Sequence, residues 1–101
     1  MIPEIAERRA DLEGLCRRFG VRRLEVFGSA ATGEFRAEDS DLDLLVEFDA
    51  ASAGAADRYF GLLESLEQLF GLPVDLVVAS AIKNPYFRES VERTKTLLYA
   101  A

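Results

Sequence analysis

The sequence contains no histidine and only one cysteine, Cys16. Without histidine, the chain cannot use a histidine general base, a Ser–His nucleophile pair or a histidine-bound zinc ion. A single cysteine cannot form an internal disulfide, which excludes a small secreted fold held together by disulfides. Cys16 lies among apolar residues at helical spacing, so we expect it in the core and not as a nucleophile.

Long apolar runs and net positive charge are missing as well. No segment reaches 18 uninterrupted apolar residues, so nothing is expected to span a membrane. The N-terminal segment MIPEIAERRADLEGL mixes acidic and basic side chains and is not expected to be a signal peptide. With 12 Lys and Arg against 18 Asp and Glu, the net charge is −6. This balance argues against direct DNA binding, because phosphate contacts need basic side chains. We expect a cytoplasmic protein.

The composition that is present is that of an ordinary folded domain. Half of the 101 residues are apolar and 30% are charged, which is typical of globular proteins and not of disordered ones. A chain of this length suits one hydrophobic core. We therefore expect residues 1–101 to form a single domain.

Periodicity predicts alternating helices and strands. Helices are expected over residues 3–19 and 57–70, and from the Asn84–Pro85 start signal to about Arg93. Strands are expected over residues 21–27, 41–48 and 74–79, with a short edge strand at 97–100. Residues 29–40 are expected to form a short helical turn and a loop, and residues 49–56 a connector. This order predicts an α/β (α+β) fold: a mixed sheet of three to four strands with helices mainly on one face.

Two aspartates interrupt the clearest strand. Asp41 and Asp43 share one face with α-carbons about 6.6 Å apart, while Leu42 and Leu44 point to the other face. Carboxylates in this position are unusual, because like charges repel and aspartate is a poor strand former. Two converging carboxylates are the oxygen ligands that a hard divalent cation prefers. The simpler interpretation is a solvated strand start.

Asp75 repeats this pattern in the strand 74–79. Its neighbours Val74 and Leu76 are apolar, so Asp75 faces the same side as Asp41 and Asp43 if the two strands are neighbours. A third carboxylate there could bind a second metal ion or accept a proton from an attacking hydroxyl. Taken alone, Asp75 is more often a surface acid at a strand entrance.

Gly28 and Ser29 directly follow the strand 21–27. A glycine lets backbone amides approach a phosphate, and a serine hydroxyl adds a donor. A Gly-Ser pair after a strand is usually only a turn. Together with the acids, in this order, the pair indicates a phosphate-binding turn beside a metal site, which is what metal-assisted transfer from a nucleoside triphosphate needs.

Two stretches carry a family resemblance: VFGSAATG at 26–33 and DSDLDLLVEF at 39–48. They resemble the signature of the DNA polymerase beta-type nucleotidyltransferase superfamily. The shortness of the chain is similar to its minimal nucleotidyltransferases, the antitoxin partners of HEPN-domain toxins. The resemblance covers essentially the whole chain and implies the nucleotidyltransferase fold. It also implies that Gly28 and Ser29 hold triphosphate oxygens, that Asp41 and Asp43 bind two Mg²⁺ ions, and that Asp75 is a metal ligand and base.

The function implied by the resemblance is transfer of AMP from ATP to a hydroxyl, a tyrosine of a partner HEPN toxin, in a hetero-oligomer. One position departs from the family pattern: Thr32 stands where these proteins commonly carry an arginine, and threonine cannot supply charge to a phosphate. Arg36, Lys83 or Arg88 are the candidates to compensate. The alternative is a binding module that neutralises its partner by contact.

Two further interpretations stay open. The chain could be a structural subunit whose acids keep it in solution or bind calcium, although no segment resembles the twelve-residue calcium loop. Three arginine pairs suggest a contact surface: 8–9, 17–18 and 22–23. In an acidic chain we expect these to be solvated or to bind a protein partner, and not to bind nucleic acid.

Overall fold

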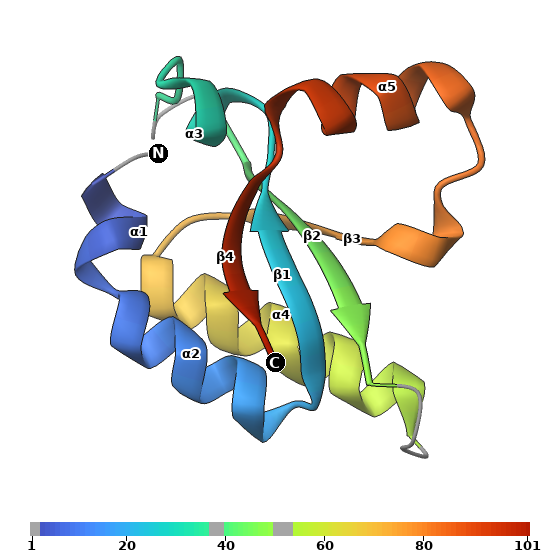
Figure 1. The fold of residues 1–101 in the computed structure, drawn as a ribbon. Coiled ribbons are helices and arrows are strands. Elements are labelled where there is room, and N and C mark those ends of the chain that lie inside the picture. Colours follow the sequence, from blue (N-terminus) through green and yellow to red (C-terminus); the bar gives the residue numbers. More distant parts are fainter. Residues whose placement is uncertain (1–2, 37–39, 50–53) are drawn as a thin grey trace.

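The computed structural model describes residues 3–36, 40–49 and 54–101 (Figure 1). Asp39 and residues 50–53 of the predicted connector 49–56 therefore lie outside the described residues. The helices are α1 (Pro3–Glu7), α2 (Arg9–Arg18), α3 (Ser29–Thr32), α4 (Ala55–Phe70) and α5 (Pro85–Thr94), with a 3₁₀ turn at Ala79–Ala81. The strands are β1 (Val21–Val26), β2 (Leu42–Phe48), β3 (Val74–Val78) and β4 (Thr96–Ala100).

The strands form one four-stranded sheet in the order β3-β2-β1-β4. β1 pairs antiparallel with both β2 and β4, whereas β2 and β3 run parallel. A parallel pair needs a crossover connection, and α4 provides it. The predicted mixed sheet of three to four strands is confirmed, including the edge strand near the C-terminal end.

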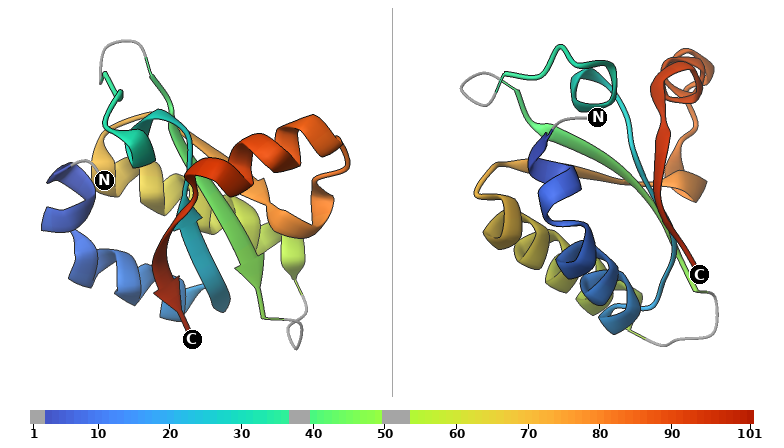
Figure 2. Two further views of the ribbon diagram at one scale, coloured as in Figure 1. Left: turned by 45° about the horizontal axis from the view of Figure 1, so that its top comes forward. Right: turned by 60° about the vertical axis from the view of Figure 1, so that its left-hand side comes forward.

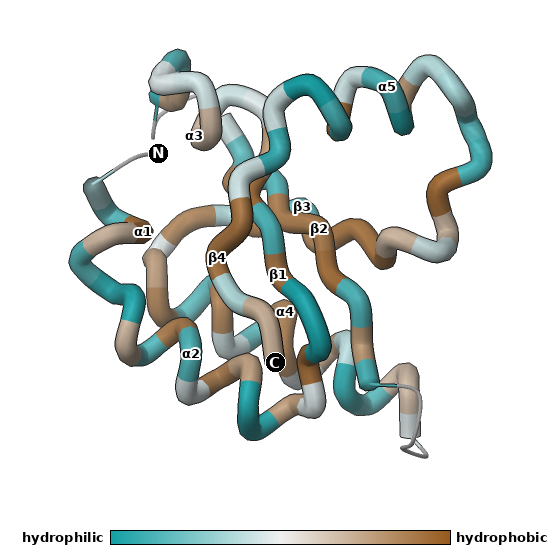
Figure 3. The backbone as a smooth tube through the Cα atoms, viewed as in Figure 1, coloured by the Kyte–Doolittle hydropathy of each residue, from teal (hydrophilic) through white to brown (hydrophobic). Residues whose placement is uncertain are grey.

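One face of the sheet carries the main core. α2 and α4 cover this face, as Figure 2 shows from the side. Leu42, Leu44 and Val46 alternate along β2 and are fully buried against this core, and in Figure 3 the central strands β1 and β2 carry both hydrophobic and hydrophilic residues. Cys16 on α2 is also fully buried, and burial raises the pKa of its thiol to about 12. The prediction that Cys16 is a core residue is confirmed.

The other face of the sheet is covered at one end by α5. A second, smaller apolar cluster lies there, formed by Phe27, Leu45, Ile82 and Val91. α5 begins as predicted: the Asn84 side chain accepts hydrogen bonds from the backbone amides of Tyr86 (2.8 Å) and Phe87 (3.3 Å). Helices therefore lie mainly, but not only, on one face.

The prediction of one continuous helix over residues 3–19 is wrong. The helix breaks at Arg8, whose N–H donates to the Ile5 carbonyl (3.1 Å) and closes a turn one residue shorter than an α-helical turn. No glycine or proline stands at the break. Ile5 and Leu12 are both fully buried on either side of it, so packing against the core, and not a local breaker residue, accounts for the two short helices.

In the described parts of the chain, we find no helix that is both long and apolar enough to cross a membrane.

Candidate active site

The turn after β1 requires a glycine. Gly28 has φ 70° and ψ −147°, a conformation that side-chain-bearing residues rarely adopt. A Cβ at this position would lie 2.6 Å from Oδ2 of Asp43. The Gly28 carbonyl accepts hydrogen bonds from the amides of Ala31 (3.1 Å) and Thr32 (3.2 Å), and α3 begins at the next residue. Gly28 therefore lets the Asp43 carboxylate lie directly against the backbone of the turn.

The parallel pairing of β2 and β3 brings two predicted acids together. Asp43 is opposite Asp75 in the register, and side chains opposite each other on neighbouring strands point to the same face, with the strands about 4.8 Å apart. The Leu42 amide donates to the Pro73 carbonyl (2.9 Å), so the pairing extends to the first residue of β2. Asp41 lies exposed just before β2. Sequence analysis predicted that Asp75 faces the same side as Asp41 and Asp43 if the two strands are neighbours, and β2 and β3 are neighbours.

The electrostatics of Asp43 reflect this crowding. The pKa of the Asp43 carboxyl is raised from 3.8 to about 6, first by burial and then by the negative charges of Asp75 and Asp41. Among the described residues, no hydrogen bond or ion pair reaches this carboxylate. A half-buried carboxylate between two other acids is destabilised when charged, and a divalent cation would relieve the repulsion.

The oxygen donors therefore fit Mg²⁺ in their chemistry. Over residues 3–36, 40–49 and 54–101, no three or more of the Asp, Glu, His and Cys side chains form one compact group around a single ion position. The assignment of Asp41, Asp43 and Asp75 as metal ligands stays a prediction.

Sequence analysis missed Thr94, at the end of α5. The Gly28 N–H donates to Oγ1 of Thr94 (2.9 Å). Because this amide already has a partner, it is not available to a phosphate. The remaining candidate donors are the hydroxyl and the amide of Ser29, which stands at the first position of α3, where helical geometry provides no partner for the amide. No local signal could have linked Thr94 to Gly28, since 66 residues separate them.

The candidate replacements for the missing arginine do not contact the turn. Thr32 is exposed, and its hydroxyl donates to the Ser29 carbonyl (3.4 Å). Arg88 donates through Nη2 to the Ile82 carbonyl (2.6 Å), which ties it to the loop before α5. Arg36 and Lys83 are exposed, and within the described residues neither forms an ion pair or side-chain hydrogen bond with Gly28 or Ser29.

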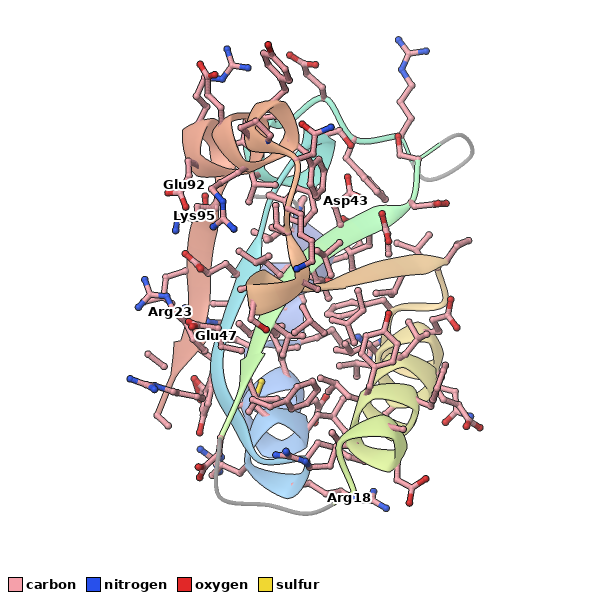
Figure 4. The ribbon with its side chains drawn as sticks, turned by 90° about the vertical axis from the view of Figure 1, so that its right-hand side faces the viewer. Arg18, Arg23, Asp43, Glu47, Glu92 and Lys95 are labelled. Carbon is pink, nitrogen blue, oxygen red and sulfur yellow. The ribbon has the colours of Figure 1, made fainter. Side chains whose placement is uncertain are left out.

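A charged pocket of about 200 Å³ lies between the sheet and α5, on the face of the sheet that carries Asp43 and Asp75. Glu25 on β1 is buried and pairs with Arg23 (3.3 Å) and Lys95 (3.9 Å), and Lys95 also contacts Glu92 (3.0 Å). Arg23 is therefore held by an ion pair and is not simply solvated. In Figure 4, Glu92 and Lys95 lie at α5 and Arg23 lies lower on the sheet, with Asp43 nearer the end of the sheet by α3 and α5 and Arg18 at the opposite end.

A larger, open groove of about 680 Å³ lies between α2 and α4, and none of the predicted site residues lines it. The chemistry-bearing residues instead gather on the other face of the sheet, where β1 ends and β2 and β3 begin. This arrangement places the Gly28–Ser29 turn next to the carboxylates of Asp43 and Asp75.

Comparison with known proteins agrees with this geometry. The family model described as "Nucleotidyltransferase domain" matches residues 10–98. "Putative protein adenylyltransferase MJ1379" of Methanocaldococcus jannaschii is 41% identical over 75 residues, 74% of each chain. The protein adenylyltransferase MntA of Thermococcus cleftensis is 48% identical over 67 residues, 66% of this chain and 65% of that one.

Solved structures show the same fold. A structure described as a "putative minimal nucleotidyltransferase" has a TM-score of 0.75 and 41% identity, and the match covers 91% of this chain and 90% of that one. An MNT antitoxin of Shewanella oneidensis, in complex with a tri-AMPylated HEPN toxin, has a TM-score of 0.66 at 17% identity, with 95% and 72% covered. The second likeness concerns the fold alone. By the family match over most of its length and by its close relatives, this chain belongs to the nucleotidyltransferase domain family.

Proposed function

We propose that this chain, as a single minimal domain, is a metal-dependent nucleotidyltransferase that moves AMP from ATP onto a tyrosine hydroxyl of a partner HEPN toxin and so acts as an antitoxin. The observation that carries the proposal is the Asp43 carboxylate, which lies against the Gly28 turn and faces Asp75 across the β2–β3 pair. The names of the relatives support the class of reaction. The fold shared with an antitoxin bound to a HEPN toxin supports the partner.

Each group at the site has a role in this reaction. The amide and hydroxyl of Ser29 donate to phosphate oxygens. Asp41, Asp43 and Asp75 would hold Mg²⁺, and two bound ions would neutralise phosphate charge and help to activate the acceptor oxygen. The tyrosine oxygen forms a bond to the α-phosphorus, and the bond from that phosphorus to the bridging oxygen breaks, so pyrophosphate leaves. The exposed Asp75 carboxylate accepts the tyrosine proton.

The direct test uses a HEPN-domain protein as the candidate acceptor. The two proteins are incubated with ATP and Mg²⁺, and the intact mass of the HEPN protein is measured. We expect addition of AMP with the wild-type chain and none with Asp75→Asn. Glu47→Gln, which removes an exposed acid farther along β2, should behave like the wild type. If AMP were added equally with Asp75→Asn, Asp75 would not be the base.

Neutralisation by contact is the second candidate function, and the environment of Thr32 favours it. Within the part of the chain that the structure describes, no positively charged side chain forms an ion pair or side-chain hydrogen bond with Gly28 or Ser29: Thr32 is exposed, and Arg88 is bonded to a backbone carbonyl. In this case the two chains would co-elute in size-exclusion chromatography and the toxin would be inhibited without added ATP. Inhibition that requires ATP and leaves AMP on the partner would support transfer instead.

Restoring the arginine should strengthen nucleotide binding. Thr32→Arg is expected to tighten ATP binding by roughly 1–3 kcal/mol, the range for charge-assisted hydrogen bonds. Position 32 is exposed, so the longer side chain can be accommodated without disturbing the core. Titration calorimetry with ATP and Mg²⁺ measures the change, and Thr32→Gln, which has length but no charge, is the control. An unchanged affinity in the arginine variant would mean that α3 does not direct this position at phosphate.

A further inference from the structure

We infer that Thr94 is a positioning residue for the phosphate-binding turn: it holds Gly28 in the one conformation that allows Ser29 to donate to a nucleotide. This inference rests on the proposed function for its consequence in nucleotide binding. The hydrogen bond between Gly28 and Thr94 is itself a feature of the fold and does not depend on the proposed function.

The Thr94 hydroxyl is oriented by two hydrogen bonds. It accepts from the Gly28 N–H (2.9 Å) and donates to the Ser90 carbonyl (3.3 Å), one turn back along α5. Because the Thr94 hydroxyl donates its proton to the Ser90 carbonyl, its oxygen lone pairs are available to accept from Gly28. The acceptor for the Gly28 amide is thus set in place by the last turn of α5.

Gly28 is constrained from three directions. Its N–H donates to Thr94, its carbonyl accepts from the amides of Ala31 and Thr32 in α3, and the Asp43 carboxylate occupies the space where a Cβ would lie. A glycine with φ 70° has many alternative conformations, because it lacks the side chain that would restrict them. Two of these constraints come from within the turn and β2. Thr94 is the constraint that comes from α5.

α5 is joined to this turn at a second point. The Phe87 ring, near the start of α5, packs edge-on against Phe27, with centroids 6.0 Å apart. Phe27 precedes Gly28, and its N–H donates to the Asp43 carbonyl (3.1 Å). The helix therefore contacts the chain at residues 27 and 28 from both of its ends, and the hydroxyl of Thr94 is the contact that is specific to the Gly28 amide.

The first arm of the test needs no nucleotide. Thr94→Val keeps the shape of the side chain and removes the acceptor, and Thr94→Ser restores it. Amide hydrogen exchange by NMR should show the Gly28 amide exchanging about fivefold faster or more in Thr94→Val. The Phe27 amide, bonded to Asp43, should change little. Thr96→Val is the matched control, because the Thr96 hydroxyl donates to the Thr94 carbonyl (3.4 Å) and does not reach the turn.

The second arm measures the transfer reaction with the same variants. A turn that samples the wrong conformation binds ATP in only part of the population, so Thr94→Val should raise KM for ATP about fivefold or more, with a smaller change in kcat. Thr94→Ser should restore KM. A purely structural loss would lower the active fraction, and so kcat, at unchanged KM.

The outcomes separate the two claims. Unchanged exchange of the Gly28 amide in Thr94→Val would overturn the inference. So would faster exchange with an unchanged KM, because the bond would then exist without positioning the site. If the wild type neither binds nor transfers the nucleotide, the proposed function fails and the positioning role fails with it, even where the exchange arm confirms the bond.

Discussion

Asp43→Asn is expected to lower nucleotide transfer at least about a hundredfold, because it removes the carboxylate that we propose as a metal ligand, at the point where the turn and the other acids meet. The substitution keeps the size of the side chain, so the partner-binding surface and the fold should be retained. Transfer of label from radioactive ATP to the partner measures the loss. Glu47→Gln, on the same strand, is the control and should keep transfer. A folded Asp43→Asn variant with unchanged transfer would contradict the site assignment.

The same variant should stabilise the metal-free protein. The pKa of Asp43 is raised to about 6 in the folded state, from 3.8. The folded state therefore binds a proton more tightly than the unfolded state, and the free energy of unfolding falls as pH rises from about 4 to about 6. Asparagine has no charge to lose. With a chelator present, Asp43→Asn should match the wild type near pH 4 and be more stable by about 1 kcal/mol at pH 7, after allowance for solvent screening.

Magnesium should reverse this order of stability and make the wild type more stable than Asp43→Asn. An ion that binds only the folded site at 100 times its dissociation constant adds about 2.7 kcal/mol to the free energy of unfolding. The wild type should gain most of this, and Asp43→Asn much less. Thermal melts with chelator and then with millimolar Mg²⁺ make the comparison. Equal shifts in both proteins, together with a destabilised variant in chelator, would mean that the acids do not form one site.

Gly28→Ala is expected to have the other large effect, on stability and activity together. Alanine at this position would have to adopt φ 70°, and its Cβ would lie 2.6 Å from Oδ2 of Asp43. Backbone strain of this kind costs about 1–3 kcal/mol, and relief of the contact requires Asp43 to move. We expect a lower melting temperature and loss of transfer in the same assay.

Two further variants separate strain from contact. Gly33 also has a positive φ, 89°, but a Cβ there meets nothing within 4 Å, so Gly33→Ala carries strain alone and should destabilise less. In the double variant Gly28→Ala with Asp43→Ala, the carboxylate is gone and the contact is relieved. The double variant should therefore be more stable than the sum of the two single effects predicts. Strict additivity would show that the Asp43 contact does not matter.

Much of the fold could be predicted because the signals are local. Alternation along residues 42–48 and the Asn84–Pro85 cap each report on backbone geometry within a few residues, and the structure confirms both. The same period places Asp41 and Asp43 on one face. The break at Arg8 could not be predicted, because no residue there disfavours a helix and only packing on both sides of it interrupts the hydrogen bonds.

The sequence by itself determined the strands, most of the helices and which side chains each can present, because hydrogen bonding and side-chain direction within a helix or strand repeat over a few residues. It placed Gly28 and Ser29 after one strand and the aspartates on two others. Only the tertiary structure decided that Asp75 stands opposite Asp43, that Thr94 holds the Gly28 amide, and that Lys95 pairs with the buried Glu25. These contacts join residues on different elements, and strand order, register and helix docking are set by burial of the whole core, which no local pattern encodes.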